Sequence, residues 1–334
     1  MNNIKIKQRD LTIDFLRCVG LLLIVLAHVD PPNFIFQMRT CDVPIMVFVS
    51  GMAFSLSTHD IDSISKYKVY IWKRFKRLII PTWIFLTAYF IFFGILKCFF
   101  VRNADISFTI PLIIRSYSLI DGVGYVWVIR VYFLMALIAP MIKKLVKLNI
   151  KTQLIVVICA GIINEILSQY LEQMDGGIFF VLKYTLLYIL GYGIIYYFGN
   201  VCQKMSNIKL SYITILFLAV FVVILLVTHQ PSIQAAKYPP KMYYISYGMI
   251  ASLILLMMAR MEKLKLIRES KLVSLISKYS LELYFWHTIP IQLVKYHVIE
   301  LLLDCFITRY CFAIIIAAIG TFFQVKIRNK VNGK

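Results

Sequence analysis

Long apolar runs recur along the whole chain, and they restrict its fold more than any other feature. A helix needs about 20 apolar residues to cross about 30 Å of hydrocarbon, where every backbone group must be hydrogen-bonded internally. Hydrophobic residues make up 60% of the 334 residues, and charged residues only 16%. We therefore predict an all-α, polytopic integral membrane protein. About ten transmembrane helices are expected, near 11–29, 42–58, 79–100, 126–142, 152–170, 180–199, 211–228, 241–259, 280–297 and 302–324.

Lysine and arginine are distributed unevenly among the predicted connections. With the N-terminus in the cytoplasm, most of the 36 lysine and arginine residues fall on cytoplasmic connections. The opposite connections carry only Arg39, Arg102, Arg115, Lys237, Lys241 and Arg309. The positive-inside rule then places both termini in the cytoplasm. Topology thus accounts for the net charge of +20, and we expect no nucleic-acid partner.

The chain reads as a single transmembrane domain over residues 1–334, without an appended soluble domain. The first apolar segment is too long for a signal peptide and does not end in a small-x-small cleavage site, so a retained helix is expected. The seven cysteines form no CxxC pair. Neither a disulfide framework nor a metal site is therefore expected.

Arg17 and His28 stand eleven residues apart in the first apolar segment. Eleven residues make three helical turns, so both side chains share one face, with their Cα atoms about 16 Å apart. Asp14, three residues before Arg17, lies on the same face. Ionisable side chains inside a membrane are costly and usually functional, which favours His28 and Arg17 as catalytic residues. Alternatively, Arg17 extends to the inner interface, His28 sits at the outer one, and Asp14 is an interface charge rather than a partner that orients Arg17.

A basic stretch, residues 72–77, leads into the third predicted helix. Arg74 and Arg77 are three residues apart and project to one side of a helix, where they can bind the phosphates of a nucleotide-bearing cofactor. The alternative is a positive-inside anchor. In the second helix, Ser50 precedes Gly51. Small residues usually permit close helix packing, so Ser50 is treated as a supporting residue rather than a nucleophile.

Trp127 and Arg130 begin the fourth predicted helix at its outer end. An interfacial aromatic residue is the default interpretation of Trp127. Arg130 lies further into the membrane, where a charge needs a function. Asp30 closely follows His28 at the same end of the membrane. We predict that Trp127, Arg130 and Asp30 bind a substrate from the outer side.

Glu282, Tyr284 and His287 enter the ninth predicted helix from the cytoplasmic side. Tyr284 and His287 are three residues apart and share a face. We predict that both help to bind a ligand that arrives from the cytosol, with Glu282 in a supporting role. A structural core histidine is an equally good interpretation of His287.

Taken together, these segments resemble the bacterial acyltransferase-3 family, polytopic enzymes that O-acylate cell-surface glycans. The matching stretches span the chain and are 11–17 with His28, 48–51, 73–81, Trp127, and 280–284 with His287. The resemblance implies an acyl donor, usually acetyl-CoA, that is approached from the cytoplasm. It also implies that Arg17 and His28 match the arginine–histidine pair of the family, and that Arg74 and Arg77 match its basic motif. The aromatic-rich tripeptide usual around this tryptophan is here Trp127-Val128-Ile129, followed by Arg130, which leaves the acceptor open.

The function expected from the resemblance is a membrane O-acyltransferase of the bacterial cytoplasmic membrane. It would transfer an acetyl group to a hydroxyl of an O-antigen, capsule, exopolysaccharide or lipid-linked oligosaccharide, without a metal. The alternative is a transporter or flippase of a lipid-linked saccharide, although the sequence lacks the paired, interrupted segments of many carriers. The identity of the glycan, the acyl group and the oligomeric state stay open.

Overall fold

The computed structural model describes residues 9–56, 61–100, 106–174, 176–229, 232–299 and 305–331. Arg102 and parts of the predicted segments 42–58 and 302–324 lie outside the described residues, as do both ends of the chain. The described residues form helices and no strand, so the predicted all-α class is confirmed. The α-helices are α1 (Leu11–Ala27), α2 (Asn33–Met38), α3 (Asp42–Ser55), α4 (Ile64–Ile95), α5 (Ile110–Tyr117), α6 (Trp127–Leu145), α7 (Ile150–Glu172), α8 (Gly177–Cys202), α9 (Asn207–Thr228), α10 (Met242–Ala259), α11 (Lys265–Arg268), α12 (Lys271–Lys278), α13 (Ser280–Trp286), α14 (Thr288–Lys295) and α15 (Phe306–Val331).

Six helical segments are long and apolar enough to cross a membrane, as judged among the described residues. They are Ile64–Phe99, Ile150–Glu172, Gly177–Cys202, Asn207–Thr228, Met242–Ala259 and Phe306–Lys330. The other predicted spans are helical too, but α1 has 17 residues, α3 has 14, α6 carries several charges, and the ninth segment is interrupted. A polytopic membrane protein is thus supported, while the ten-helix count and the cytoplasmic termini stay predictions.

Local signals define α1. The Asp10 carboxylate caps its first turn by accepting hydrogen bonds from the backbone N–H groups of Thr12 and Ile13. The helix ends at Ala27, because His28 already leaves helical geometry and Pro31 and Pro32 follow. The core of the helix is apolar, which allows it to lie in the centre of the bundle against α3, α10, α12 and α13.

The helix that carries the third predicted span, 79–100, begins well before residue 79. Helix α4 begins at Ile64, where Ser63 caps it by accepting a hydrogen bond from the N–H of Lys66. The basic stretch is therefore part of one 32-residue helix. Lysine and arginine are good helix formers, so polarity did not prevent the helix from extending. Arg74 and Arg77 are thus carried on the same rigid element as the apolar span.

The ninth predicted span, 280–297, was expected to be one helix, and this expectation is wrong. It is divided into α13 and α14, with His287 at the junction. Pro290 gives the physical reason, because proline has no N–H to donate to the carbonyl four residues earlier, that of Trp286. Side chains bond the carbonyls of this turn instead: the Thr288 hydroxyl donates to the carbonyl of Phe285 at 2.8 Å. His287 itself keeps helical backbone geometry, and its side chain is fully buried.

Helices α3 and α8 pack very closely through glycines. A Cβ atom on Gly51 would lie 2.2 Å from the carbonyl oxygen of Tyr196, and one on Gly199 would lie 2.1 Å from that of Phe48. Small residues let helix backbones approach in a membrane. The packing interpretation of the Ser50–Gly51 pair therefore applies to Gly51.

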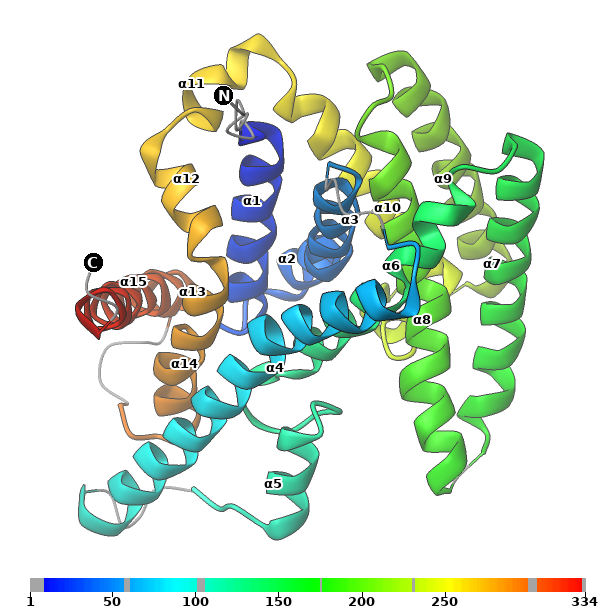
Figure 1. Ribbon diagram of the computed structural model, residues 1–334. Helices are drawn as coiled ribbons and strands as arrows, with labels where there is room; N and C mark the ends of the chain where they lie inside the picture. Colours follow the sequence, from blue (N-terminus) through cyan, green and yellow to red (C-terminus); the bar gives the residue numbers. More distant parts are fainter. Residues whose placement is uncertain are drawn as a thin grey trace.

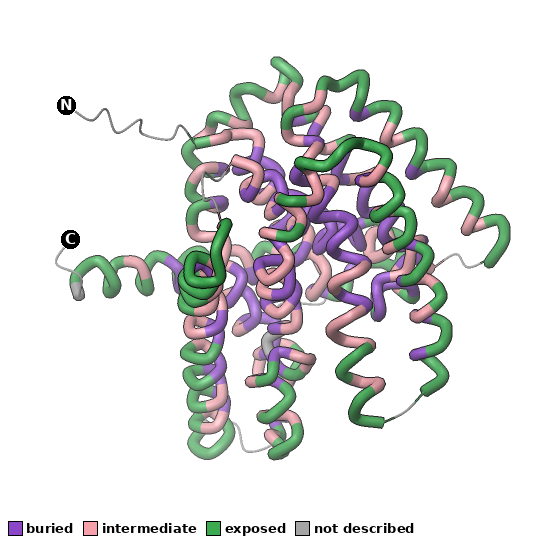
Figure 2. Tube along the Cα trace, turned by 45° about the vertical axis from the view of Figure 1, so that its right-hand side comes forward, coloured by how far each residue is buried: buried purple, intermediate pink, exposed green. Residues whose placement is uncertain are grey.

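The helices gather around α1 and α3 (Figure 1). Helices α7, α8 and α9 lie on one side of this pair, and α12 to α15 lie on the other, with α4 crossing the bundle obliquely. Buried residues concentrate in the middle and exposed residues on the outer faces (Figure 2). Many exposed residues are large and apolar, as along α7 and α9, which is typical of surfaces that face lipid.

Candidate active site

One face of α1 lines two cavities. Arg17, Leu21 and Ile24 border a large cavity of about 1240 Å³, and Ile24 and His28 border a small one of about 190 Å³. These residues are spaced by three or four, so the predicted shared face of Arg17 and His28 is real. The two side chains nevertheless line different cavities, and Ile24 is the residue that both cavities share among those that the structure describes.

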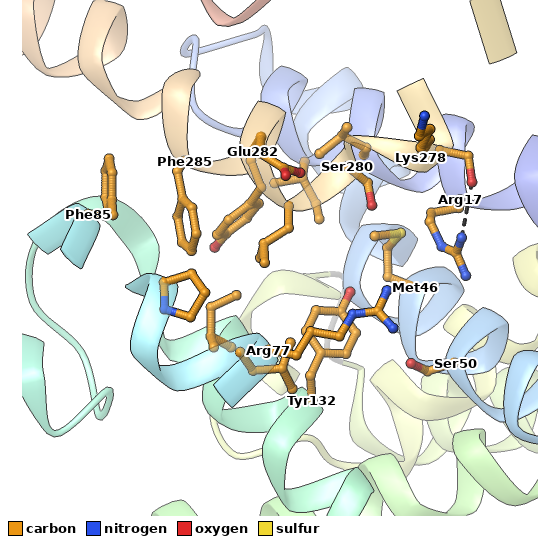
Figure 3. A pocket seen from close by; sticks show the side chains of 18 of the residues that line it. Arg17, Met46, Ser50, Arg77, Phe85, Tyr132, Lys278, Ser280, Glu282 and Phe285 are labelled. Atoms are coloured by element: carbon orange, nitrogen blue, oxygen red, sulfur yellow. Dashed lines mark hydrogen bonds between the residues drawn. The ribbon is translucent and has the colours of Figure 1, made fainter. Parts of the chain in front are cut away.

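The large cavity is strongly basic at the end that holds Arg17. Arg74 and Arg77 of α4 line it together with Arg17, so the structure brings the three predicted arginines to one place. Arg17 and Arg77 are directed into the same space from different helices (Figure 3). Further cations on its wall are Arg9, Lys278 and Arg328. Such a concentration of positive charge suits a polyanionic ligand such as the phosphates of a nucleotide.

Arg17 is held in place by a small polar network. Its guanidinium donates to the Ser277 hydroxyl at 3.0 Å, and that hydroxyl donates to Asp14 at 2.6 Å. The buried Asp14 carboxylate also pairs with Arg9. Asp14 therefore orients Arg17 mainly through Ser277, since the direct Arg17–Asp14 distance is 3.8 Å.

Glu282, Tyr284 and Ser50 also line the large cavity. The Glu282 carboxylate accepts a hydrogen bond from Arg328 at 2.7 Å, so this acid is already paired. Beyond the basic end, the cavity continues along α4 between apolar residues such as Phe85 and Phe92. The cavity thus combines a charged end with an apolar end.

The small cavity lies at the other end of α1, where His28 follows the last helical residue. The His28 ring stacks on Tyr125, with ring centroids 3.6 Å apart. Trp127 lines the same cavity, as do Tyr238 and Lys237. Burial lowers the pKa of the Lys237 ammonium in its connecting loop, while the neighbouring Asp42 carboxylate raises it.

His28 and His287 form a histidine pair. The Nδ1 atom of His28 lies 3.2 Å from Nε2 of His287, and Nδ1 of His287 contacts the carbonyl oxygen of Tyr284. A carbonyl only accepts, so Nδ1 of His287 must carry a hydrogen, and in the neutral ring Nε2 is then an acceptor. His28 therefore donates from Nδ1. This leaves Nε2 of His28 as its basic nitrogen.

Tyr284 connects the two cavities. Its ring lines the large cavity, and its hydroxyl donates to the carbonyl oxygen of Tyr125 at 2.6 Å. Tyr125 has a positive φ of 57°, an uncommon conformation for a tyrosine, and stacks on His28. The hydrogen bond from Tyr284 helps to hold that conformation, and with it the stacking partner of the imidazole.

Three predicted site residues lie apart from the groups expected. His287, predicted to help bind a ligand that arrives from the cytosol, contacts His28 and is absent from the described residues that line the large cavity. Arg130 packs against the rings of Tyr184 and Tyr188 of α8, 5.3 and 5.0 Å from their centroids. Its side chain borders neither cavity among the described residues.

Asp30 is an exposed residue that pairs with Arg309 at 3.1 Å. Like Arg130, it does not border the small cavity within the described part of the chain. Of the three predicted acceptor-binding residues, the structure therefore places only Trp127 beside His28.

Comparison with known families decides the identity of the chain. The model of the acyltransferase 3 family, described as an acyltransferase domain, matches residues 10–323. The chain belongs to this family. The match contains all the residues that the sequence predicted for the site, and the resemblance seen in the motifs is confirmed. No curated protein and no solved structure matches the chain.

Membership of the acyltransferase 3 family makes the chain a membrane acyltransferase. Among the described residues, no group of three or more histidine, cysteine, aspartate or glutamate side chains is placed to hold a metal.

The sequence did not single out several residues that line the small cavity, above all Tyr125, Arg39, Asp42 and Lys237. A signal for the two cations was present. Arg39 and Lys237 are among the few cations on the predicted outer side, where the positive-inside rule gives them no reason to be. Tyr125 offered no comparable signal, because an aromatic residue at a membrane interface is common.

Proposed function

We propose that the protein transfers an acetyl group from cytoplasmic acetyl-CoA to a hydroxyl of a cell-surface glycan. The observation that carries the proposal is the course of α1, which joins the basic cavity at Arg17 to the imidazole of His28. A donor whose phosphates bind at the basic end needs a catalytic group some distance away. The pantetheine arm of a coenzyme has the length to bridge that distance.

The donor would bind in the large cavity. Arg17, Arg74 and Arg77 bind its phosphates, and the pantetheine arm follows the cavity towards Ile24. Arg17 is held by Ser277 and needs no reorganisation on binding. Preorganised arginines contribute most where several contact the same polyanion.

The acceptor hydroxyl would enter beside His28 from the small cavity. Nε2 of His28 takes the hydroxyl proton while the oxygen attacks the thioester carbonyl, and a tetrahedral intermediate forms. The carbon–sulfur bond then breaks, and the imidazolium returns the proton to the departing thiolate. The products are an ester and free coenzyme A. A positioned general base contributes about 10²–10⁴-fold to the rate.

His287 serves as a positioning residue in this mechanism. Its Nε2 accepts the Nδ1 hydrogen of His28, which selects the tautomer with a basic Nε2. When His28 becomes an imidazolium, the same contact stabilises the new charge. A covalent acyl-histidine intermediate on Nε2 of His28 uses the same geometry, and a trapped acyl-enzyme would distinguish it from direct transfer.

The proposed location and acceptor of the enzyme follow the expectations from the sequence. The enzyme would lie in the cytoplasmic membrane of a bacterium, with a lipid-linked oligosaccharide or surface polysaccharide as acceptor. Many surface glycans are assembled on lipid carriers at that membrane, which suits a small cavity at the end of α1 opposite the basic cavity.

The test uses purified protein in nanodiscs with radiolabelled acetyl-CoA and extracted lipid-linked glycan. His28→Ala and Arg17→Ala should abolish label transfer while both variants still insert into the membrane. His229→Asn is the matched control, because His229 is exposed at the end of α9 and asparagine tolerates its positive φ of 50°. A His28→Ala protein that acetylates at the wild-type rate would overturn the proposal. Movement of lipid-linked sugar between leaflets without label transfer would favour a flippase instead.

A further inference from the structure

The small cavity contains a buried cluster of three charges. The Arg39 guanidinium donates to one oxygen of Asp42 at 3.0 Å, and the Lys237 ammonium donates to the other at 3.2 Å. All three side chains are about 3% exposed. All three also line the cavity together with His28. The cluster has two positive charges and one negative charge.

The positive charge is not balanced within the cavity. Asp42 is the only carboxylate among the described residues that line it, and its Oδ1 atom also accepts from the N–H of Val43 at 2.7 Å. Asp30, the other acid at this end of α1, pairs with Arg309. The buried Nε of Arg39 has no partner among the described residues. An unbalanced buried charge is expensive and is usually kept for a ligand.

The walls of the cavity suit a sugar ring. Tyr125, Trp127 and Tyr238 contribute flat aromatic surfaces, and Gln234 contributes an amide that both donates and accepts. Aromatic walls with a few convergent polar groups are typical of small-molecule sites. Lys237 lies over the rings of Trp127 and Tyr238, at 5.5 and 5.6 Å, so the charge and the aromatic surfaces form one site.

We propose that Lys237 and Arg39 bind an anionic group, a carboxylate or a phosphate, that the acceptor carries near its reacting hydroxyl. This inference rests on the proposed function, because it names the class of acceptor for that site. The bound anion balances the cluster. It also stabilises the imidazolium that forms on His28, since opposite charges attract strongly where water is excluded. An acceptor without the anion loses both effects.

The test measures binding, which does not depend on acyl transfer. Purified protein in nanodiscs is titrated by ligand-observed NMR with methyl β-glucuronide, glucose 6-phosphate and the neutral methyl β-glucoside. At least one anionic sugar should bind about tenfold or more tightly than the neutral one, as expected for a charge-assisted hydrogen bond. The two anionic probes distinguish a carboxylate from a phosphate as the natural group.

Lys237→Met should remove the preference for the anionic sugar over the neutral sugar and leave Arg39 and Asp42 as a balanced pair. The preference is a ratio within one preparation, so partial loss of folded protein cancels. Lys241→Met is the matched control, because Lys241 pairs with Glu172 outside the cavity, and it should keep the preference. His28→Ala should keep it too, which separates this inference from the catalytic proposal.

Two results would overturn the inference. One is a wild-type protein that binds neither anionic sugar more tightly than the neutral sugar. The other is a Lys237→Met protein that keeps the wild-type ratio, which would make the cluster purely structural.

Discussion

The histidine pair provides the sharpest test of the proposed mechanism. His287→Phe keeps an aromatic ring in the buried position but removes the atom that accepts the Nδ1 hydrogen of His28 at 3.2 Å. The donor on His28 is then buried without a partner, which costs about 1–3 kcal/mol. If that interaction is needed mainly in the transition state, kcat falls about 5- to 150-fold. Removal of the base itself in His28→Ala should cost more, because a general base contributes about 10²–10⁴-fold.

The assay is steady-state acetyl transfer in nanodiscs, with acetyl-CoA varied at saturating acceptor. The KM for acetyl-CoA should be unchanged in His287→Phe, because the arginines that bind its phosphates line the other cavity. His287→Gln should recover part of kcat, since its amide oxygen is able to accept a hydrogen bond near the original Nε2 position. Size-exclusion profiles and melting temperatures of the variants establish that they are folded.

Two outcomes would contradict this reasoning. If His287→Phe retains the wild-type kcat, His287 does not position the base. If instead it raises the KM for acetyl-CoA and leaves kcat unchanged, His287 binds the donor, as the sequence alone suggested.

Two further predictions concern the donor and the packing of the helices. Arg74→Gln and Arg77→Gln should each raise the KM for acetyl-CoA about tenfold, as expected for one lost charge-assisted contact. Neither should change the KM for acetyl-pantetheine, which has no nucleotide phosphates, and an equal rise for both donors would contradict phosphate binding. Gly51→Ala should destabilise the protein by about 1–3 kcal/mol and lower its Tm, because its Cβ would lie 2.2 Å from the carbonyl oxygen of Tyr196. Gly94→Ala is the control: its Cβ would meet no atom within 4 Å, so Tm should stay or rise, and a fall equal to that of Gly51→Ala would refute the packing argument.

Parts of the site that depend on one helix could be predicted from the sequence. Arg17 and His28 share a face because the period of the helix fixes the direction of side chains eleven residues apart. Arg74 and Arg77 share a side for the same reason. Helix α4 begins at residue 64, fifteen residues before the predicted span, and the relation between its two arginines does not depend on where it begins.

Parts of the site that depend on contacts between two helices could not be predicted from the sequence. His287 is 259 residues from His28 in sequence. Its position on its own helix is compatible with a contact to the acyl donor or with a contact to His28. The packing of α13 against α1 decided between them, because it placed Nε2 of His287 3.2 Å from Nδ1 of His28. Arg39, Asp42 and Lys237 likewise come together only when the loop before α10 folds over the start of α3.

The sequence by itself determined that this chain is helical, lies in a membrane and carries an arginine and a histidine on one stripe of its first helix. Apolar length and helical period are local properties, so they survive any arrangement of the helices. Only the tertiary structure decided that the arginine and the histidine line separate cavities, and which distant side chains accompany each. Contacts between helices depend on packing and on helix breaks, which no local pattern specifies.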